Sequence, residues 1–97
     1  MIESGDIHLA DLNDERRWQV LVVSSRRFND ASGRALVAPE VASSPGEVLA
    51  PWRINIDGSV YALDLLRSLP SERLLDRLGR APAAAMSLVQ RAIANIT

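Results

Sequence analysis

The alternation of hydrophobic and polar residues predicts β-strands in the first two thirds of the chain. Residues 6–10 alternate with a period of two, which is typical of a half-buried strand. Residues 18–24 form a hydrophobic run rich in β-branched side chains, which favours a central, buried strand. Residues 34–41 predict a third strand, in which Pro39 cannot donate to the sheet and therefore marks an edge, a bulge or the last paired position.

Turn signals indicate how these strands are connected. Asp57-Gly58 stands between the alternating residues 52–56 and the run 59–66, and this dipeptide is the strongest short-range signal for a β-hairpin. Residues 29–33 are expected to form a turn between the second and third strands, with the final glycine at positive φ. Such connections predict a compact, highly curved antiparallel sheet.

The pattern changes in the last third of the chain. Residues 71–73 resemble the start of a helix that soon ends, which predicts a short helical turn followed by a brief strand at residues 75–78. Pro82 suits the first turn of a final helix. Hydrophobic residues then recur at three- and four-residue spacing, namely Ala85, Leu88, Val89, Ala92, Ile93 and Ile96. This stripe predicts a C-terminal helix that packs on the sheet, within a single, mainly β domain of residues 1–97.

Composition excludes several classes of protein. The 97 residues are 47% hydrophobic and 24% charged, the balance of an ordinary soluble globule. The absence of cysteine excludes disulfides and thiolate metal sites, and the single histidine, His8, cannot build a histidine-rich site, so neither a metal nor another cofactor is expected. Residues 1–6 are acidic rather than typical of a signal peptide, and the longest apolar run, residues 20–23, is too short to span a membrane. We therefore expect a cytoplasmic protein.

The charge distribution leaves nucleic-acid recognition open. A net charge of −1 argues against a general, charge-driven nucleic-acid binder. All eleven basic residues are arginine, which codon bias in a GC-rich genome explains best. Residues 16–34 nevertheless contain five arginines and one acidic residue, and the planar guanidinium group suits phosphate binding. No stand-alone catalytic motif is present, so the function depends on residues that the fold brings together.

Three segments in register resemble one family. Residues 5–12, Gly-Asp-Ile-His-Leu-Ala-Asp-Leu, are similar to the first strand of the MazF/PemK toxins of type II toxin–antitoxin systems. Residues 20–39 match the second and third strands of that family with the turn between them, and residues 64–80 match the segment before its C-terminal helix. The resemblance implies a small SH3-like barrel with a terminal helix, working as a homodimer. It also implies a sequence-specific endoribonuclease that cleaves single-stranded RNA without a metal, arrests growth, and is inhibited by a cognate antitoxin with a disordered, acidic-hydrophobic tail.

Three positions depart from the family pattern. Trp18 and Gln19 stand where the family has an Arg-Pro pair, Val41 replaces a Thr or Ser, and Ala62 replaces an Arg. Of the usual catalytic set, Asp64 alone is retained.

RNA cleavage through the 2′-hydroxyl needs a base, an acid and a cation for the charge on the phosphorane. Arg16 and Arg17 lie just before the substituted Trp18 and are the candidates for the positive charge, with Asp64 to orient them. His8 has the chemistry for general acid–base work, although a lone histidine in an alternating strand is more often structural.

His8 and several other residues are candidates for RNA binding. Trp18 and Trp52 are expected to stack on unpaired bases, with core or dimer packing as the alternative for at least one of them. Ser24 belongs to the family pattern, but a serine at the end of a buried strand usually serves backbone hydrogen bonding.

Arg67 is a candidate phosphate ligand, and an equally strong alternative is a solvated ion pair with Asp64 or Glu72. Residues 26–27, both arginine, most simply provide solvated charge beside a strand, with an acidic antitoxin tail as the alternative partner.

Two other functions remain open. The CcdB gyrase poisons resemble the same barrel and open their second strand with an aromatic residue, as Trp18 does here. Their activity needs a C-terminal Trp-Gly-Ile, whereas residues 94–97 read Ala-Asn-Ile-Thr. A non-catalytic family member that binds RNA or antitoxin is the other alternative, because three catalytic positions are substituted.

Overall fold

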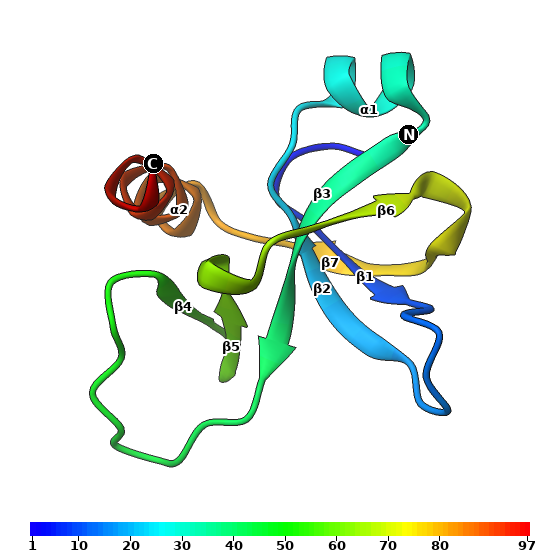
Figure 1. Ribbon diagram of the computed structural model, residues 1–97. Coiled ribbons are helices and arrows are strands. Elements are labelled where there is room, and N and C mark those ends of the chain that lie inside the picture. Colours follow the sequence, from blue (N-terminus) through cyan, green and yellow to red (C-terminus); the bar gives the residue numbers. More distant parts are fainter.

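The computed structural model describes all residues from 1 to 97 as a curved sheet with two α-helices (Figure 1). In chain order the elements are β1 (Asp6–Ala10), β2 (Trp18–Val22), α1 (Arg26–Ser32), β3 (Arg34–Val41), β4 (Arg53–Ile56), β5 (Ser59–Ala62), the 3₁₀ turn η1 (Leu63–Leu65), β6 (Arg67–Pro70), the 3₁₀ turn η2 (Ser71–Arg73), β7 (Leu74–Arg80) and α2 (Ala83–Ile96). The prediction of a mainly β fold with a C-terminal helix is therefore confirmed.

All strand pairs in the sheet are antiparallel, and β3 connects its two halves. The strand order is β4-β5-β3-β2-β1-β7, with β6 pairing to β3 off this path. The first half of β3 pairs with β6 and its last two residues pair with β5, so one long strand passes from one half of the sheet to the other. The sheet curves strongly, as predicted. It remains open, because the terminal strands β4 and β7 do not pair with each other.

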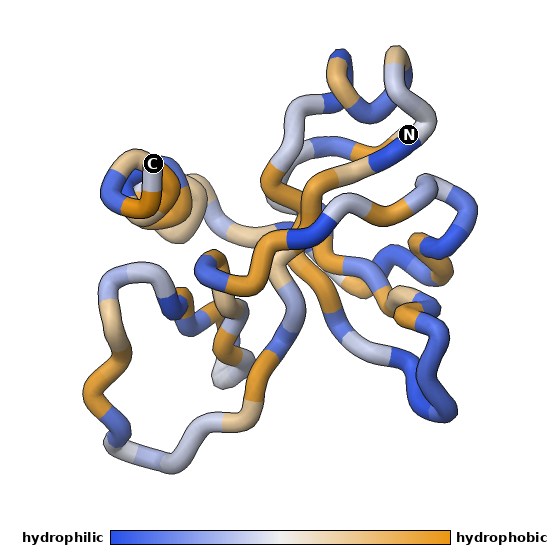
Figure 2. Tube along the Cα trace, viewed as in Figure 1, coloured by the Kyte–Doolittle hydropathy of each residue, from blue (hydrophilic) through white to orange (hydrophobic).

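Two hydrophobic cores lie on opposite faces of β1, β2 and β3. One core is enclosed by the curled sheet and includes Ala10, Val20, Val22 and Val37. The other is covered by α2 and the β4–β5 hairpin, and it contains residues from these elements together with Leu21 from β2. Figure 2 shows hydrophobic segments along the central strands and a hydrophilic β1–β2 connection. Each fully buried Val or Leu side chain stabilises the fold by about 1.5–3 kcal/mol relative to exposure.

The β4–β5 hairpin forms around Asp57-Gly58 as predicted. Both residues have positive φ, 52° and 86°, as a type I′ turn requires. The Asn55 side chain accepts a hydrogen bond from the Gly58 N–H at 3.2 Å, which supports the turn. The pairing that follows places Arg53 opposite Ala62.

Residues 26–32 form the helix α1, so the turn expected at residues 29–33 is wrong. Ser25 caps the helix by accepting a hydrogen bond from the Phe28 N–H, and Gly33 ends it in the left-handed conformation at φ 69°. A serine N-cap and a glycine after the last turn are helix boundary signals. They enclose a helix of only seven residues, too short for a clear hydrophobic periodicity.

The C-terminal third contains one strand more than the sequence predicted. The strand expected over residues 59–66 ends at Ala62, and β6 follows as a separate strand on β3. The predicted helical turn and brief strand are confirmed as η2 and β7, and α2 begins directly after Pro82. Helix α2 packs against the sheet through the buried side chains of Ala85, Val89 and Ala92, whereas Leu88 is 49% exposed. Neither helix is long and apolar enough to cross a membrane.

Candidate functional site

The largest hollows of the surface adjoin one another around Trp18. Two of them, of about 420 and 430 Å³, share four lining residues, Trp18, Glu40, Val41 and Ala42. A third, of about 300 Å³, continues beneath the loop between β3 and β4 and shares Ser43, Gly58 and Val60 with the first of these hollows. The three hollows adjoin one another through these shared residues and are together named the Trp18 groove here.

The β1–β2 connection and the end of β3 position the groove residues. Trp18 opens β2, and its indole Nε1 donates to the Asp14 carboxylate at 3.2 Å. The Arg16 guanidinium lies over the indole ring, 3.9 Å from its centroid. This geometry is a cation–π contact, which holds a positive charge at the groove wall. Asp14 and Arg16 of the exposed β1–β2 connection thus both contact Trp18, the first residue of β2.

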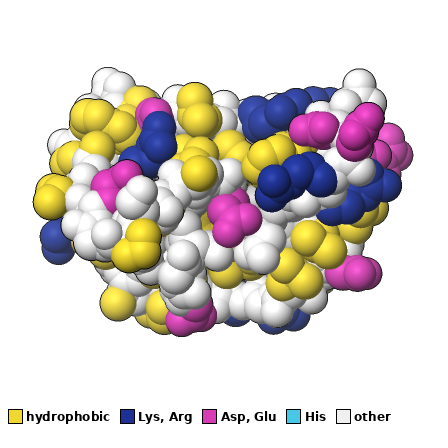
Figure 3. All heavy atoms as spheres, turned by 90° about the horizontal axis from the view of Figure 1, so that it is seen from below, with side chains coloured by type: hydrophobic (Ala, Val, Ile, Leu, Met, Phe, Trp, Pro, Cys, Tyr) yellow, Lys and Arg dark blue, Asp and Glu magenta, His cyan; other side chains and the backbone are white.

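Charges of both signs line the groove. Arg16 borders one of the two larger hollows and Arg67 the other, and the residue Glu40 borders both. Glu40 forms no salt bridge. Burial raises the pKa of Tyr61, and the charge of Glu40 raises it further. Viewed from below the orientation of Figure 1, arginine side chains gather toward one end of the molecule with acidic side chains beside them (Figure 3).

Asp64 forms a bidentate ion pair with Arg53. The guanidinium Nε and Nη2 donate to the two carboxylate oxygens at 2.8 and 3.0 Å. This hydrogen bonding lowers the pKa of Asp64 and raises the pKa of Arg53. Asp64 is therefore ionised at neutral pH, and its geometry suits holding an arginine rather than transferring a proton. Arg53 stands directly across the hairpin from Ala62, so this cation approaches Asp64 from β4.

Two of the sequence-predicted residues lie inside the protein, away from the groove. Ser24 is 8% exposed, and its hydroxyl donates to the Asn29 side chain and accepts from the Leu36 N–H. His8 is 7% exposed in β1, with Nδ1 3.2 Å from the Leu75 carbonyl oxygen and Nε2 3.9 Å from the Asp6 carboxylate. Both side chains have structural contacts in these positions.

The remaining predicted residues lie at the margins. Arg17 is half exposed and 3.8 Å from the Asp11 carboxylate. Trp52 is 39% exposed next to Arg53, and its carbonyl accepts from the Leu63 N–H. Of the predicted set, the groove therefore brings together Arg16, Trp18 and Arg67.

Glu40 and Arg53 are not among the site residues predicted from the sequence. Glu40 is a charged residue directly after Pro39 near the end of a predicted strand, which is the only local signal of its position. The position of Arg53 could have been predicted from the sequence, because a two-residue turn at Asp57-Gly58 fixes the hairpin register and pairs residue 53 with residue 62.

Comparison with known proteins gives one family. A profile described as PemK-like, MazF-like toxin of type II toxin-antitoxin system matches residues 3–97. No curated protein matches the sequence.

Three solved structures illustrate the likeness in fold. The first, an endoribonuclease in complex with its cognate antitoxin from a mycobacterial species, has a TM-score of 0.85 at 18% identity, over 98% of this chain and 93% of that one. A MazE–MazF structure from Deinococcus radiodurans has a TM-score of 0.81 at 20% identity, with the same coverage of 98% and 93%. The Mycobacterium tuberculosis toxin MazF-mt6 has a TM-score of 0.77 at 22% identity, over 93% of each chain.

Proposed function

The chain belongs to the PemK-like, MazF-like toxins of type II toxin–antitoxin systems, and on that premise we propose that it is an endoribonuclease that cleaves single-stranded RNA at specific sequences and arrests growth. The observation that carries this proposal is the Trp18 groove, whose adjoining hollows are lined by an aromatic residue, by one arginine each and by Glu40, which forms no salt bridge. Unpaired RNA is recognised through such stacking surfaces and guanidinium groups.

Arg16 and Arg67 hold the RNA backbone in this proposal. They border the two larger hollows of the groove, so their charges are placed to bind phosphates along one strand. Arg16 covers one face of Trp18, and the guanidinium plane is itself a surface on which a base stacks. Arg17 is half exposed beside Asp11 and adds positive charge near the same connection.

Glu40 and Arg16 supply the chemistry. The Glu40 carboxylate takes the proton of the 2′-hydroxyl, and the 2′-oxygen attacks the adjacent phosphorus. The bond to the 5′-oxygen breaks, and this oxygen takes a proton from water. The products are a 2′,3′-cyclic phosphate and a 5′-hydroxyl end. Arg16 stabilises the negative charge that develops on the phosphate oxygens, and no step uses a metal.

Asp64 has a positioning role in this scheme. Its ion pair with Arg53 holds that guanidinium in place, and the charge of Glu47, which borders the third hollow of the groove, acts on the same guanidinium. Arg53 thereby supplies a cation across from Ala62, the position where the family has an arginine. In this proposal Arg53 takes the place of the arginine that is absent at Ala62.

We also infer the partners of the toxin. The groove carries the apolar side chains of Leu12, Val41 and Leu65 next to Arg67, which suits an antitoxin tail with both hydrophobic and acidic residues. The mycobacterial endoribonuclease was solved with its cognate antitoxin. We propose that the toxin is a homodimer, that a cognate antitoxin covers the groove, and that the protein acts in the cytoplasm.

The test is cleavage of a randomised single-stranded RNA pool by the purified full chain in the presence of a chelator. Sequencing of the cleavage ends should reveal a short preferred sequence with 5′-hydroxyl products. Arg16→Ala should reduce cleavage at least tenfold, whereas Arg91→Ala, which removes the single charge of α2, should leave it unchanged. RNA binding without turnover would instead identify a non-catalytic member of the family, and the ribonuclease proposal would then fail.

A further inference from the structure

A series of side-chain contacts runs from Asp14 through Trp18 to Arg16. The Asp14 carboxylate uses both of its oxygens, since Oδ1 accepts from the Glu15 N–H at 2.6 Å and Oδ2 accepts from the Trp18 indole Nε1–H at 3.2 Å. The Arg16 guanidinium lies over the indole ring, 3.9 Å from its centroid. Asp14 and Arg16 thus contact the same ring at two places and form no salt bridge with each other.

The position of the Arg16 guanidinium depends on the orientation of this ring. Arg16 forms no salt bridge, in contrast to its neighbour Arg17, which lies 3.8 Å from the Asp11 carboxylate. The indole has a single hydrogen-bond donor, Nε1–H, and Asp14 accepts from it. Asp14 therefore orients the ring on which Arg16 lies.

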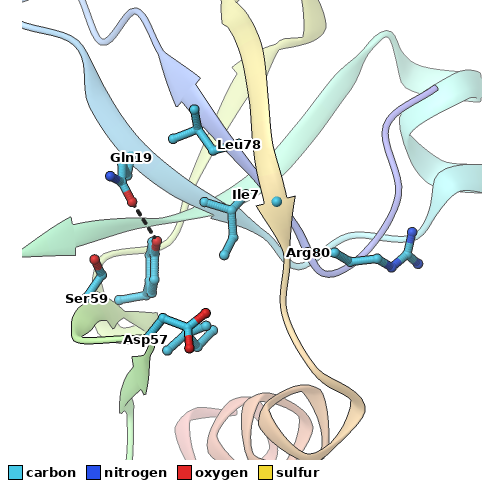
Figure 4. Close-up of a pocket in the computed structure, with 9 residues that line it drawn as sticks. Ile7, Gln19, Asp57, Ser59, Leu78 and Arg80 are labelled. Atoms are coloured by element: carbon cyan, nitrogen blue, oxygen red, sulfur yellow. Dashed lines mark hydrogen bonds between the residues drawn. The ribbon is translucent and has the colours of Figure 1, made fainter.

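The backbone of Trp18 is held by other contacts. Gln19, the next residue of β2, points to the opposite face of the sheet, because successive side chains of a strand alternate. There its Oε1 accepts from the hydroxyl of Tyr61, which is 1% exposed, at 3.1 Å (Figure 4). Trp18 itself pairs with Ala10 of β1. The start of β2 is therefore fixed, and Asp14 acts on the direction of the ring rather than on the strand.

The β1–β2 connection is folded so that Asp14 reaches the indole. The Asp11 Oδ1 accepts from the Asn13 N–H at 2.9 Å, which closes a turn directly before Asp14. Asn13 has a φ of 67°, a conformation that asparagine tolerates better than most residues. The Asp11 N–H donates to the Arg73 carbonyl oxygen at 3.0 Å, which fastens the connection to η2.

Charge alone would make Asp14 unfavourable in a groove that binds RNA. Asp14 borders the same hollow as Arg67, and a carboxylate there repels phosphate groups. Glu15 carries the same charge on the same connection, but it is exposed and lines none of the three hollows. If Asp14 acted only through its charge, its removal would favour RNA binding and cleavage. If it orients the indole, its removal should slow cleavage.

We propose that Asp14 is a positioning residue that holds the Trp18 ring, and through it the Arg16 guanidinium, in the orientation that RNA cleavage requires. The inference rests on the proposed ribonuclease function, in which Arg16 stabilises the charge that develops on the phosphate oxygens. Asp14 acts through Trp18 and takes no part in the proton transfers.

Asp14→Ala and Glu15→Ala are a matched pair, because each removes one carboxylate from an exposed position of the same connection. The readout is the single-turnover cleavage rate of the full chain at saturating RNA. Asp14→Ala should lower this rate by about three- to tenfold, the effect of losing one hydrogen bond, whereas Glu15→Ala should not lower it. Asp14→Asn keeps an acceptor oxygen for the indole and should restore most of the lost rate.

Trp18→Phe tests whether Asp14 acts through the ring. The variant keeps an aromatic ring under Arg16 but removes the Nε1–H donor. In that background Asp14→Ala should cause no further loss of rate, because the hydrogen bond is already absent. Additive losses would overturn the proposal. The indole N–H resonances of the two tryptophans give a readout besides activity, since Asp14→Ala should shift the Trp18 signal and leave that of Trp52 unchanged.

The outcomes separate this inference from the function on which it rests. If the wild-type chain cleaves RNA and Asp14→Ala cleaves it at the same rate, the positioning role is overturned while the ribonuclease stands. If the wild-type chain cleaves no RNA, the proposed function fails first and the role of Asp14 in cleavage falls with it.

Discussion

The Arg16 guanidinium lies over the Trp18 ring, 3.9 Å from its centroid, while the Asp14 carboxylate accepts a hydrogen bond from the same indole. Two residues of the β1–β2 connection thus hold the tryptophan in place, Arg16 at one face of the ring and Asp14 at its edge. The remaining indole surface opens into the groove, where both larger hollows contact it. Trp18 therefore lines both larger hollows of the groove.

Trp18→Ala should weaken binding of single-stranded RNA by one to two orders of magnitude. Stacking of a base on an aromatic side chain contributes about 1–3 kcal/mol, and the substitution also releases Arg16. Fluorescence anisotropy with a labelled oligonucleotide measures the effect. Trp52→Ala is the matched control, because Trp52 is also partly exposed but does not line the groove. Equal losses in the two variants would contradict the placement of RNA around Trp18.

Glu40→Gln should lower the cleavage rate by two to four orders of magnitude while RNA affinity stays within a few-fold of the wild type. A positioned general base contributes about 10²–10⁴-fold to a rate, and glutamine keeps the shape of the side chain without accepting the proton. Single-turnover cleavage and anisotropy on the same preparations separate the two effects. Substitution of Glu72, an exposed glutamate in η2, by glutamine should change neither. A Glu40→Gln variant that cleaves at the wild-type rate would remove Glu40 from the mechanism.

Much of the fold follows from short-range patterns in the sequence. The alternation in residues 6–10 and the Asp57-Gly58 turn predict β1 and the β4–β5 hairpin, since side-chain periodicity and turn geometry act within a few residues. Helix α1 was mistaken for a turn because its seven residues are too few for a periodic stripe, although Ser25 and Gly33 mark its ends. Strand β6 was missed because its position depends on pairing with β3, more than thirty residues earlier in the chain.

Less of the candidate site than of the fold could be predicted from the sequence. Arg16, Trp18 and Arg67 were candidates because of their side-chain chemistry and their places in the sequence, and all three line hollows of the groove. The Ser24 hydroxyl forms hydrogen bonds with Asn29 and Leu36. These bonds depend on tertiary packing, which the sequence pattern does not show. Glu40 is a candidate because the end of β3 and the β1–β2 connection border the same hollow, which no local sequence pattern predicts.

The ion pair between Asp64 and Arg53 predicts a pH-dependent contribution to stability. Hydrogen bonding from Arg53 lowers the pKa of Asp64 in the folded state. A group with a depressed folded pKa stabilises the fold above its unfolded pKa, about 4 for aspartate, and loses that contribution as the pH falls through the folded value. At pH 7 Asp64→Asn should therefore be less stable than the wild type, by up to about 1 kcal/mol because the pair is partly exposed.

Denaturant unfolding of wild type, Asp64→Asn, Arg53→Gln and the double variant measures this contribution between pH 7 and pH 2.5. The advantage of the wild type over Asp64→Asn should remain constant down to about pH 4 and shrink below it. The double variant should be more stable than the sum of the two single effects predicts, because each single variant leaves one partner of the pair without its counter-charge. Asp30→Asn, which removes an exposed i,i+4 pair with Arg26, supplies the control for a surface charge. Additive effects of Arg53→Gln and Asp64→Asn at pH 7 would show that the two side chains do not act as a unit, and Asp64 would then lose its role in positioning Arg53.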